Sequence, residues 1–429
     1  GSCRTLGEVL STRKLPSLQT LSLGWHVNRG LALLCDGLSV GSLPSSLVVE
    51  FDLFKDFGVN EGGGELADQN ERAAAAAAFA SLLRASKVPG LKKVSFDTSL
   101  YLGGEVAQAF GEALSHSVGI FAVLEELCFK DDCTFLYETD HQAEEEFETL
   151  QDRALAEMLN GIARGPHPLP SLQIFPFKED PQQAVVGAQS CAALSALVVA
   201  GKVPSLREIE IRCTDPGQDV FLSLALALSS PHASSVRQLK VICQGGDGST
   251  IGAAEAGMLT TALGSGRLSG LEELSLHGRM GGEAMRALCV GLRRGKMSCL
   301  QTLNLDGNRF GVEGGRALAQ TVDAENMPRL RKLDLDDTEL GDGGMQALSE
   351  AWLQRVPPPL ESLRLSRNGI TDEGAGAVSR LLGSGRLLNM GGDQQSLGSG
   401  VYLNSNQFSI QMCSVLRGAF PGLMVSRAQ

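Results

Sequence analysis

The chain has 429 residues, of which 49 are acidic and 37 basic, so its formal net charge at pH 7 is −12. This balance disfavours nucleic acid and anionic membranes as main partners, because both reward clustered Lys and Arg. The sequence contains no apolar run long enough to cross a bilayer, and its 43% hydrophobic and 20% charged residues are typical of a folded chain. Glycine is unusually frequent, at 51 residues, while aromatic residues make up only 5%.

One short apolar pattern recurs along the chain: an apolar residue, two variable residues, a second apolar residue, one variable residue and a third apolar residue. Residues two apart in a strand face the same side, so the pattern predicts a short strand that points its last two apolar residues into a core. The clearest copies begin at Leu271, Leu300, Leu330 and Leu360, at steps of 29, 30 and 30 residues. Other copies begin at Leu18, Leu91, Leu124, Leu172, Leu206 and Val236, and weaker ones at Val48 and Val401.

A helical stretch is predicted after each strand, because Gly, Ala and Leu recur there at helical spacing, for example at 311–319 and 341–348. One strand and one helix therefore form a repeat that cannot bury its apolar face alone and must stack on its neighbours. A polar residue often stands at a fixed place after the strand, as at Asn308, Thr338, Asn368 and Asn406. These side chains are predicted to satisfy backbone groups where each strand turns away.

These repeats resemble the leucine-rich repeats of the ribonuclease-inhibitor-like subclass. The resemblance is carried most clearly by LQTLNLDGNRF at 300–310 and by LESLRLSRNGITDEGA at 360–375. It implies an α/β solenoid shaped as a curved horseshoe, with a parallel sheet on the concave face, helices on the convex face and about 12 repeats.

We expect a single repeat domain over residues 1–429. Within it, 5–130 holds degenerate N-terminal repeats, 131–152 an acidic insertion, 153–388 regular repeats, 389–400 a flexible Gly/Ser/Gln-rich loop and 401–429 a terminal repeat. The stretch Thr5–Lys14 resembles the helix of a repeat whose strand is missing, which predicts that native sequence continues upstream of Gly1.

Ten scattered cysteines form no zinc-type pattern and no clustered disulfide framework, which predicts reduced thiols and a cytoplasmic protein. Cys213 and Cys243 occupy equivalent places in adjacent repeats and should lie close together, either as packed thiols or as a regulated disulfide. The acidic stretch near Asp132 and the loop Gln244–Gly252 could be imagined as metal and phosphate sites. Neither has an established spacing, and a solvated acidic loop and an ordinary turn are favoured.

The sequence contains no catalytic motif, so no catalytic, cofactor-binding or metal-binding residue is assigned and the protein is predicted not to be an enzyme. The variable positions of the strands should instead line the concave face and bind a protein. The predicted binding residues are Glu208, Glu210, Arg212, Lys240, Glu273, His277, Asp306, Lys332, Asp334, Asp336, Arg364 and Tyr402.

The predicted function is therefore a non-catalytic interaction module within a larger intracellular receptor or scaffold, with no cofactor. The resemblance also implies two alternatives, a small-GTPase regulator similar to Ran GTPase-activating proteins and a ribonuclease inhibitor. An acidic patch at Asp306, Asp334 and Asp336 would suit a basic partner. The identity of that partner is left open.

Overall fold

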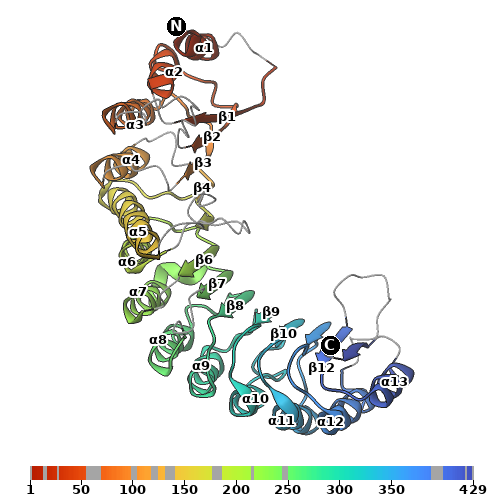
Figure 1. The fold of residues 1–429 in the computed structure, drawn as a ribbon. Coiled ribbons are helices and arrows are strands. Elements are labelled where there is room, and N and C mark those ends of the chain that lie inside the picture. Colours follow the sequence, from red (N-terminus) through yellow and green to blue (C-terminus); the bar gives the residue numbers. More distant parts are fainter. Residues whose placement is uncertain are drawn as a thin grey trace. The chain divides into compact units, whose positions relative to one another are not determined.

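The computed structural model describes residues 2–12, 17–26, 29–54, 69–97, 104–116, 124–130, 141–175, 186–213, 217–243, 250–387, 400–420 and 423–427. They form two compact units, residues 1–210 and 211–429. Helices and strands alternate through both units (Figure 1). The assignment of 1–429 to one repeat domain stays a prediction.

The first unit contains α1 (Ser2–Ser11), β1 (Thr20–His26), α2 (Arg29–Ser39), β2 (Val48–Phe54), α3 (Gln69–Arg84), β3 (Leu91–Asp97), α4 (Gly104–His116), β4 (Glu126–Lys130), α5 (His141–Arg164), β5 (Ile174–Phe175) and α6 (Ala188–Val199). Strand β6 (Glu208–Cys213) begins in this unit and ends in the second.

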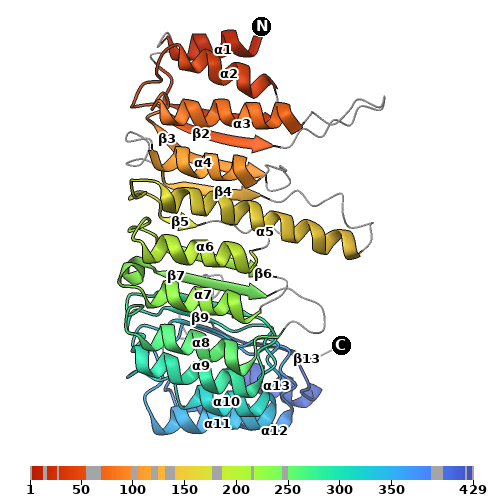
Figure 2. The same ribbon diagram turned by 90° about the vertical axis from the view of Figure 1, so that its left-hand side faces the viewer.

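The second unit continues with α7 (Gln218–Ser229), the 3₁₀ helix η2 (Pro231–Ser235), β7 (Gln238–Cys243), α8 (Ala253–Gly264), β8 (Glu273–His277), α9 (Gly282–Gly295), β9 (Thr302–Asn304), α10 (Gly311–Ala319), β10 (Lys332–Asp334), α11 (Gly341–Gln354), β11 (Ser362–Arg364), α12 (Asp372–Gly383), β12 (Gly400–Asn406), α13 (Ile410–Ala419) and β13 (Met424–Arg427). Figure 2 shows helices α8 to α12 stacked in chain order.

Within each unit the strands lie side by side in chain order and pair in parallel. In the second unit the middle leucines of the repeats are register partners: Leu274 pairs with Leu303, Leu303 with Leu333 and Leu333 with Leu363. All four are buried. The apolar pattern thus places its second residue at one level of the core in successive repeats, which confirms the predicted α/β fold of stacked strand–helix repeats.

Buried asparagines connect the turns of neighbouring repeats. Asn308 Nδ2 donates to the carbonyls of Leu276 and Leu305, at 2.7 and 2.8 Å, and its Oδ1 accepts from the N–H of Met280 at 3.0 Å. Asn406 Nδ2 donates in the same way to the carbonyl of the preceding repeat, Leu365, at 2.9 Å. These bonds confirm the predicted role of the polar residue after the strand at Asn308 and Asn406.

A second polar device joins neighbouring helices. Asp342, on α11, accepts hydrogen bonds from the N–H groups of Thr371 and Gly374 at the start of α12, at 2.8 and 2.9 Å. In the first unit Asp152, on α5, does the same for the start of α6. A carboxylate on one helix therefore satisfies the exposed N–H groups of the next helix.

Several sequence predictions meet the structure directly. The segments expected at the C-terminal end, a helix near 408–420 and a strand near 423–425, are α13 and β13. Residues 141–152 of the expected acidic insertion are the first half of α5, while its residues 131–140 and the expected loop at 389–399 lie outside the described residues. No helix in the described part of the chain has the length and apolar character needed to cross a membrane.

Candidate functional site: the open sheet face of the second unit

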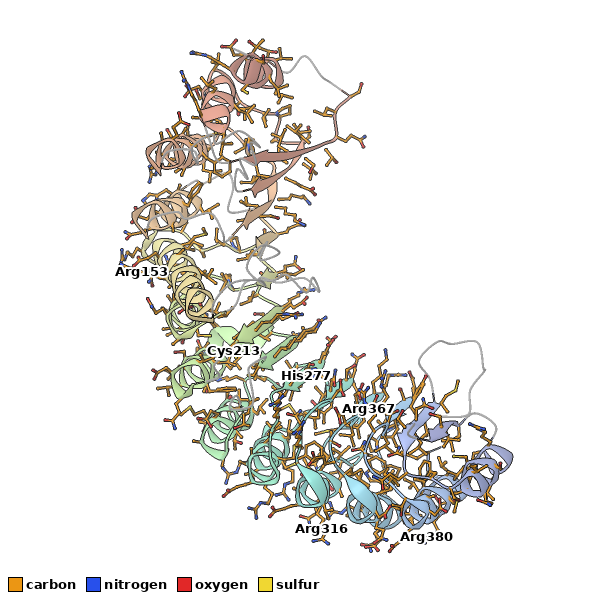
Figure 3. The ribbon with its side chains drawn as sticks, in the orientation of Figure 1. Arg153, Cys213, His277, Arg316, Arg367 and Arg380 are labelled. Atoms are coloured by element: carbon orange, nitrogen blue, oxygen red, sulfur yellow. The ribbon has the colours of Figure 1, made fainter. Side chains whose placement is uncertain are left out.

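One face of the second unit's sheet is left open by the helices. Helices α8 to α12 all lie on the same side of strands β7 to β12, as Figures 1 and 2 show. Arg316 and Arg380 mark the helix side in Figure 3, and His277 lies on the side of the strands. We call the side of β7–β12 that faces away from these helices the open sheet face. Because side chains alternate along a strand, the variable positions of each repeat belong to this face.

Strand register places the polar residues of the open sheet face in rows. Ser275 pairs with Asn304, Asn304 with Asp334, Asp334 with Arg364, and Arg364 with Tyr402. Neighbouring strands in a sheet lie about 4.8 Å apart, so successive members of this row are within reach of one another. A guanidinium therefore stands between a carboxylate and an aromatic ring.

Three aspartates and one arginine form the centre of this face, and we call them the carboxylate cluster: Asp306, Asp334, Asp336 and Arg364. Arg364 Nε lies 3.0 Å from Asp334 Oδ2, and its Nη2 lies 2.7 Å from Asp336 Oδ2. The guanidinium also lies over the ring of Tyr402, with 5.7 Å between Cζ and the ring centroid. One cation thus pairs with two carboxylates directly and lies within cation–π distance of the tyrosine ring.

The third carboxylate is less well satisfied. Asp306 Oδ1 is buried and accepts no hydrogen bond from any described residue. By contrast, Asp336 Oδ1 accepts from the N–H of Ser366 at 2.6 Å, and Asp334 Oδ1 accepts from the N–H of Asp336 at 3.1 Å. Three carboxylates facing one guanidinium leave the cluster with surplus negative charge and one unfilled acceptor.

Burial and the neighbouring carboxylates both disfavour the ionised form of Asp334. The pKa of Asp334 is raised to about 6, mainly by burial and also by the charges of Asp336 and Asp306, while the N–H of Asp336 and the guanidinium of Arg364 act in the opposite direction. The folded chain therefore disfavours the ionised form of Asp334 relative to the unfolded chain.

We expect Asp334→Asn to stabilise the second unit at pH 7.5. The folded chain binds more protons at Asp334 than the unfolded chain between about pH 4 and 6, so this group's contribution to stability falls as pH rises through that window. A shift of about two pKa units, which already includes the attraction of Arg364, corresponds to about 3 kcal/mol. Because the side chain of Asp334 is 20% exposed and partly screened by solvent, we expect a gain of about 1–2 kcal/mol. Urea unfolding at pH 7.5 and pH 4 measures the difference in free energy of unfolding between Asp334→Asn and the parent chain. This difference should vanish at the lower pH.

A matched control for this variant is Glu313→Gln on the helix side. Glu313 lies on α10, is 60% exposed and pairs with Arg286 at 3.2 Å. Its removal should change stability by less than about 0.5 kcal/mol at either pH. If Asp334→Asn instead destabilised the unit at pH 7.5, the ion pair with Arg364 would outweigh the burial of the carboxylate, contrary to this account.

Beside the carboxylate cluster, β8 carries a histidine and a glutamate. His277 Nε2 lies 3.0 Å from Ser275 Oγ. Burial lowers the pKa of His277, although the charge of Asp306 and a hydrogen bond with its backbone raise it. Glu273 Oε1 lies 3.7 Å from Nζ of Lys240, which is on β7. The face therefore carries both signs of charge, with the negative surplus concentrated at β9 and β10.

The structure brings together most, but not all, of the predicted binding residues. Arg212, Lys240, Glu273, His277, Asp306, Lys332, Asp334, Arg364 and Tyr402 belong to the second unit and are partly or fully exposed. Glu208 and Glu210 belong to the first unit. Whether any of these residues contacts a partner stays a prediction.

Two of the predicted binding residues do not face solvent, which corrects the prediction for them. Glu210 and Asp336 are each only 2% exposed. The side chain of Asp336 reaches the neighbouring repeat. Its Oδ1 accepts from the N–H of Ser366 in the turn after β11, and its Oδ2 accepts from Nη2 of Arg364 on β11. The alternating pattern indicates which side of the sheet a residue faces, but it does not show how far neighbouring groups cover it. Asp336 thus positions Arg364 and does not itself offer a contact.

Asn304 belongs to this face but is not among the predicted binding residues. Asn304 lies in the same row as Asp334, and its Oδ1 accepts from the N–H of Asp306 at 3.0 Å. This bond matches the one that Asp334 makes to the N–H of Asp336. The signal was present, since Asn304 stands 30 residues before Asp334 at the equivalent place in its repeat.

Other candidate chemistry finds no support in the described residues. No three His, Cys, Asp or Glu side chains among them come together in a way that could hold a metal ion. The stretch around Asp132 and most of the loop Gln244–Gly252 lie outside the described residues.

Comparison with known families identifies the repeats of the second unit. Residues 296–319, 327–349 and 356–379 match the sequence model of the leucine rich repeat. These three segments contain β9 with α10, β10 with α11, and β11 with most of α12. The strand–helix units at the centre of the open sheet face are therefore leucine-rich repeats, and the fold is an α/β leucine-rich-repeat solenoid.

Solved structures that match the chain share little sequence with it. A protein from Bacteroides fragilis is 13% identical, over 79% of this chain and 66% of its own, with a TM-score of 0.31. The internalin inlF from Listeria monocytogenes is 13% identical, over 88% and 91%, with a TM-score of 0.35. A chain from the complex of Rad7 and Elc1 in yeast is 16% identical, over 86% and 84%, with a TM-score of 0.35. No curated protein matches the sequence significantly.

Proposed function

We propose that this protein is a non-catalytic interaction module that binds a protein partner through the open sheet face of its second unit. We further propose that its repeats belong to the ribonuclease-inhibitor-like subclass and that the module is part of a larger receptor or scaffold. The carboxylate cluster carries the proposal, because its three carboxylates share one guanidinium and leave it with surplus negative charge. Such a cluster suits a basic side chain presented by the partner.

The surroundings of the cluster support a protein partner over a small solute. Arg364, whose side chain is 51% exposed, and the partly exposed Tyr402 stand beside the aspartates and supply the residue types that dominate protein interfaces. Lys332 and the pair of Lys240 with Glu273 extend the polar surface over the neighbouring strands. A small-GTPase regulator and a ribonuclease inhibitor remain the two alternatives, and the identity of the partner separates them.

The test compares capture of proteins from the source cell's lysate by the parent chain, Asp334→Asn and Glu313→Gln. Each variant removes one negative charge, the first on the open sheet face and the second on the helix side. We expect the specific partner to bind Asp334→Asn about tenfold more weakly, a loss of about 1.4 kcal/mol, and to bind Glu313→Gln as tightly as the parent. Titration of the identified partner against all three chains measures these affinities.

Because Asp334→Asn is expected to be more stable than the parent at neutral pH, weaker binding by this variant cannot be ascribed to unfolding. A partner held equally by the parent and Asp334→Asn, or lost equally from both variants, would contradict binding at this face. Raising the salt concentration should also weaken binding to the parent more than binding to Asp334→Asn, since the removed charge no longer contributes.

A further inference from the structure

Two buried cysteines end neighbouring strands in the second unit. Cys213 is the last residue of β6 and Cys243 the last residue of β7, and 3.2 Å separate their Sγ atoms. Cys213, marked in Figure 3, is 2% exposed and Cys243 is 9% exposed. Both are present as thiols. The sequence prediction that the two cysteines lie close together is confirmed.

The backbone around the pair suits a covalent link. Strands β6 and β7 are neighbours in the sheet, and neighbouring strands lie about 4.8 Å apart, within the range of about 4.4–6.8 Å that the Cα atoms of a disulfide span. The two sulfur atoms have to approach by only about 1.2 Å to reach bonding distance. Rotation of the side chains can supply that movement without separating the strands.

The core around Cys243 keeps the pair in place. Gly278 lies against it, and a Cβ at that position would lie 3.2 Å from Cys243 Cβ and 2.6 Å from Ile251 Cδ1. The N–H of Ile251 donates to the carbonyl of Gly278 at 2.8 Å, which fixes this close approach. The missing side chain at Gly278 gives Cys243 its room, and the surrounding packing limits where its sulfur can move.

We propose that Cys213 and Cys243 form a redox-sensitive dithiol that a peroxide converts to a disulfide joining the ends of β6 and β7. The thiolate of the more exposed Cys243 attacks hydrogen peroxide, the O–O bond breaks, and a sulfenic acid forms with release of hydroxide. The thiolate of Cys213 then attacks the sulfenic sulfur and displaces a second hydroxide. The two thiol protons neutralise the two hydroxides, so two thiols and one peroxide yield one disulfide and two waters.

The disulfide closes a loop that contains α7, η2 and β7. Closing such a loop restricts the unfolded chain, so the oxidised form should unfold at a midpoint temperature several degrees above that of the reduced form. A dithiol reductant should reverse the change. This inference is independent of the proposed partner and of the carboxylate cluster.

The test treats the native chain with hydrogen peroxide, alkylates the remaining thiols in denaturant and maps the peptides by mass spectrometry. We expect one cross-linked peptide containing Cys213 and Cys243, lighter by about 2 Da than the two separate peptides because two hydrogens are lost. Dithiothreitol should restore both alkylation sites. In Cys213→Ser and in Cys243→Ser, the rise in midpoint temperature after peroxide treatment should be absent.

Cys289 is the matched control, since it is also 2% exposed and burial raises the pKa of its thiol to about 11. It should stay alkylatable at peroxide doses that oxidise the pair. The proposal fails if Cys213 and Cys243 both remain alkylatable after peroxide has oxidised the more exposed Cys299. It also fails if either cysteine cross-links equally with other cysteines of the native chain.

Discussion

Replacing Asn368 with alanine is expected to lower the free energy of unfolding of the second unit by about 4 kcal/mol. Asn368 is 1% exposed. Its Oδ1 accepts from the N–H of Thr338 at 3.1 Å, from Thr338 Oγ1 at 2.8 Å and from the N–H of Leu340 at 3.0 Å. Its Nδ2 donates to the carbonyls of Leu335 and Ser366, at 2.6 and 3.2 Å. Alanine leaves the N–H groups of Thr338 and Leu340 buried without this acceptor, whereas the carbonyls of Leu335 and Ser366 still accept from Thr338 Oγ1 and from the N–H of Asp337.

The size of this effect follows from the neighbouring repeat. Thr338 occupies the place that Asn308 and Asn368 hold in their repeats, and its Oγ1 lies 3.0 Å from the carbonyl oxygen of Leu335 and 2.8 Å from Asn368 Oδ1. Asn368 therefore satisfies both its own turn and the turn of Thr338. Each buried N–H left unpaired costs about 1–3 kcal/mol, and Asn368→Ala leaves two of them.

Urea unfolding followed by the fluorescence of Trp352 measures this loss, since Trp352 lies buried on α11 in the same unit. The other tryptophan, Trp25, is replaced by phenylalanine in every chain compared, so that the signal reports only the second unit. Asn304→Ala is the control, because Asn304 is partly exposed and makes a local hydrogen bond to Asp306. It should cost less than about 1 kcal/mol, and an equal cost for both variants would contradict the account.

The repeats were predictable from sequence because their signals are local and recur. Leu303, Leu333 and Leu363 follow from a three-residue apolar pattern that sets strand and core together, and the period brings them into register. The asparagines were predictable for the same reason, since each acts within its own turn and the turn beside it. Repetition averages out the ambiguity that one short apolar run would leave.

The carboxylate cluster was only partly predictable. Asp306, Asp334 and Asp336 could be assigned to one face, but sequence spacing does not show that Asp336 turns away to bind Ser366 or that Arg364 lies over Tyr402. These features depend on side-chain torsions and on small offsets between strands. A shift of one or two ångströms decides whether a carboxylate is exposed or buried, and alternation along a strand carries no information at that scale.

The contacts between helices were not predictable, and Asp152 shows why. It stands on α5 and accepts from the N–H groups of Gly187, Gln189 and Ser190, at 2.8, 3.0 and 3.0 Å. The hydroxyl of Ser190 also donates to it. Helix α6 begins after Gly187, which has no side chain to cap the helix. The cap is thus supplied from 35 residues away in sequence, beyond the reach of any local capping pattern.

Replacing Asp152 with alanine should destabilise the first unit by about 3 kcal/mol, because three N–H groups in the first turn of α6 lose a charged acceptor that also complements the helix dipole. Asp152→Asn keeps one acceptor oxygen and should cost about half as much. Hydrogen exchange of the amides at Gln189 and Ser190 measures the local loss, and urea unfolding the global one. Glu157→Ala on the same helix is the control, with little change expected in the exchange of these amides.

The glycine at position 187 gives this prediction a second, independent test. A Cβ at Gly187 would lie 2.5 Å from the carboxylate of Asp152, so Gly187→Ala should push the carboxylate away and cost part of the same energy. Once Asp152 is alanine, that clash is gone. The double variant should therefore be less destabilised than the sum of the two single variants by about 1 kcal/mol or more. Strict additivity would show that Asp152 and Gly187 act separately, and the cap would then not explain how α6 begins.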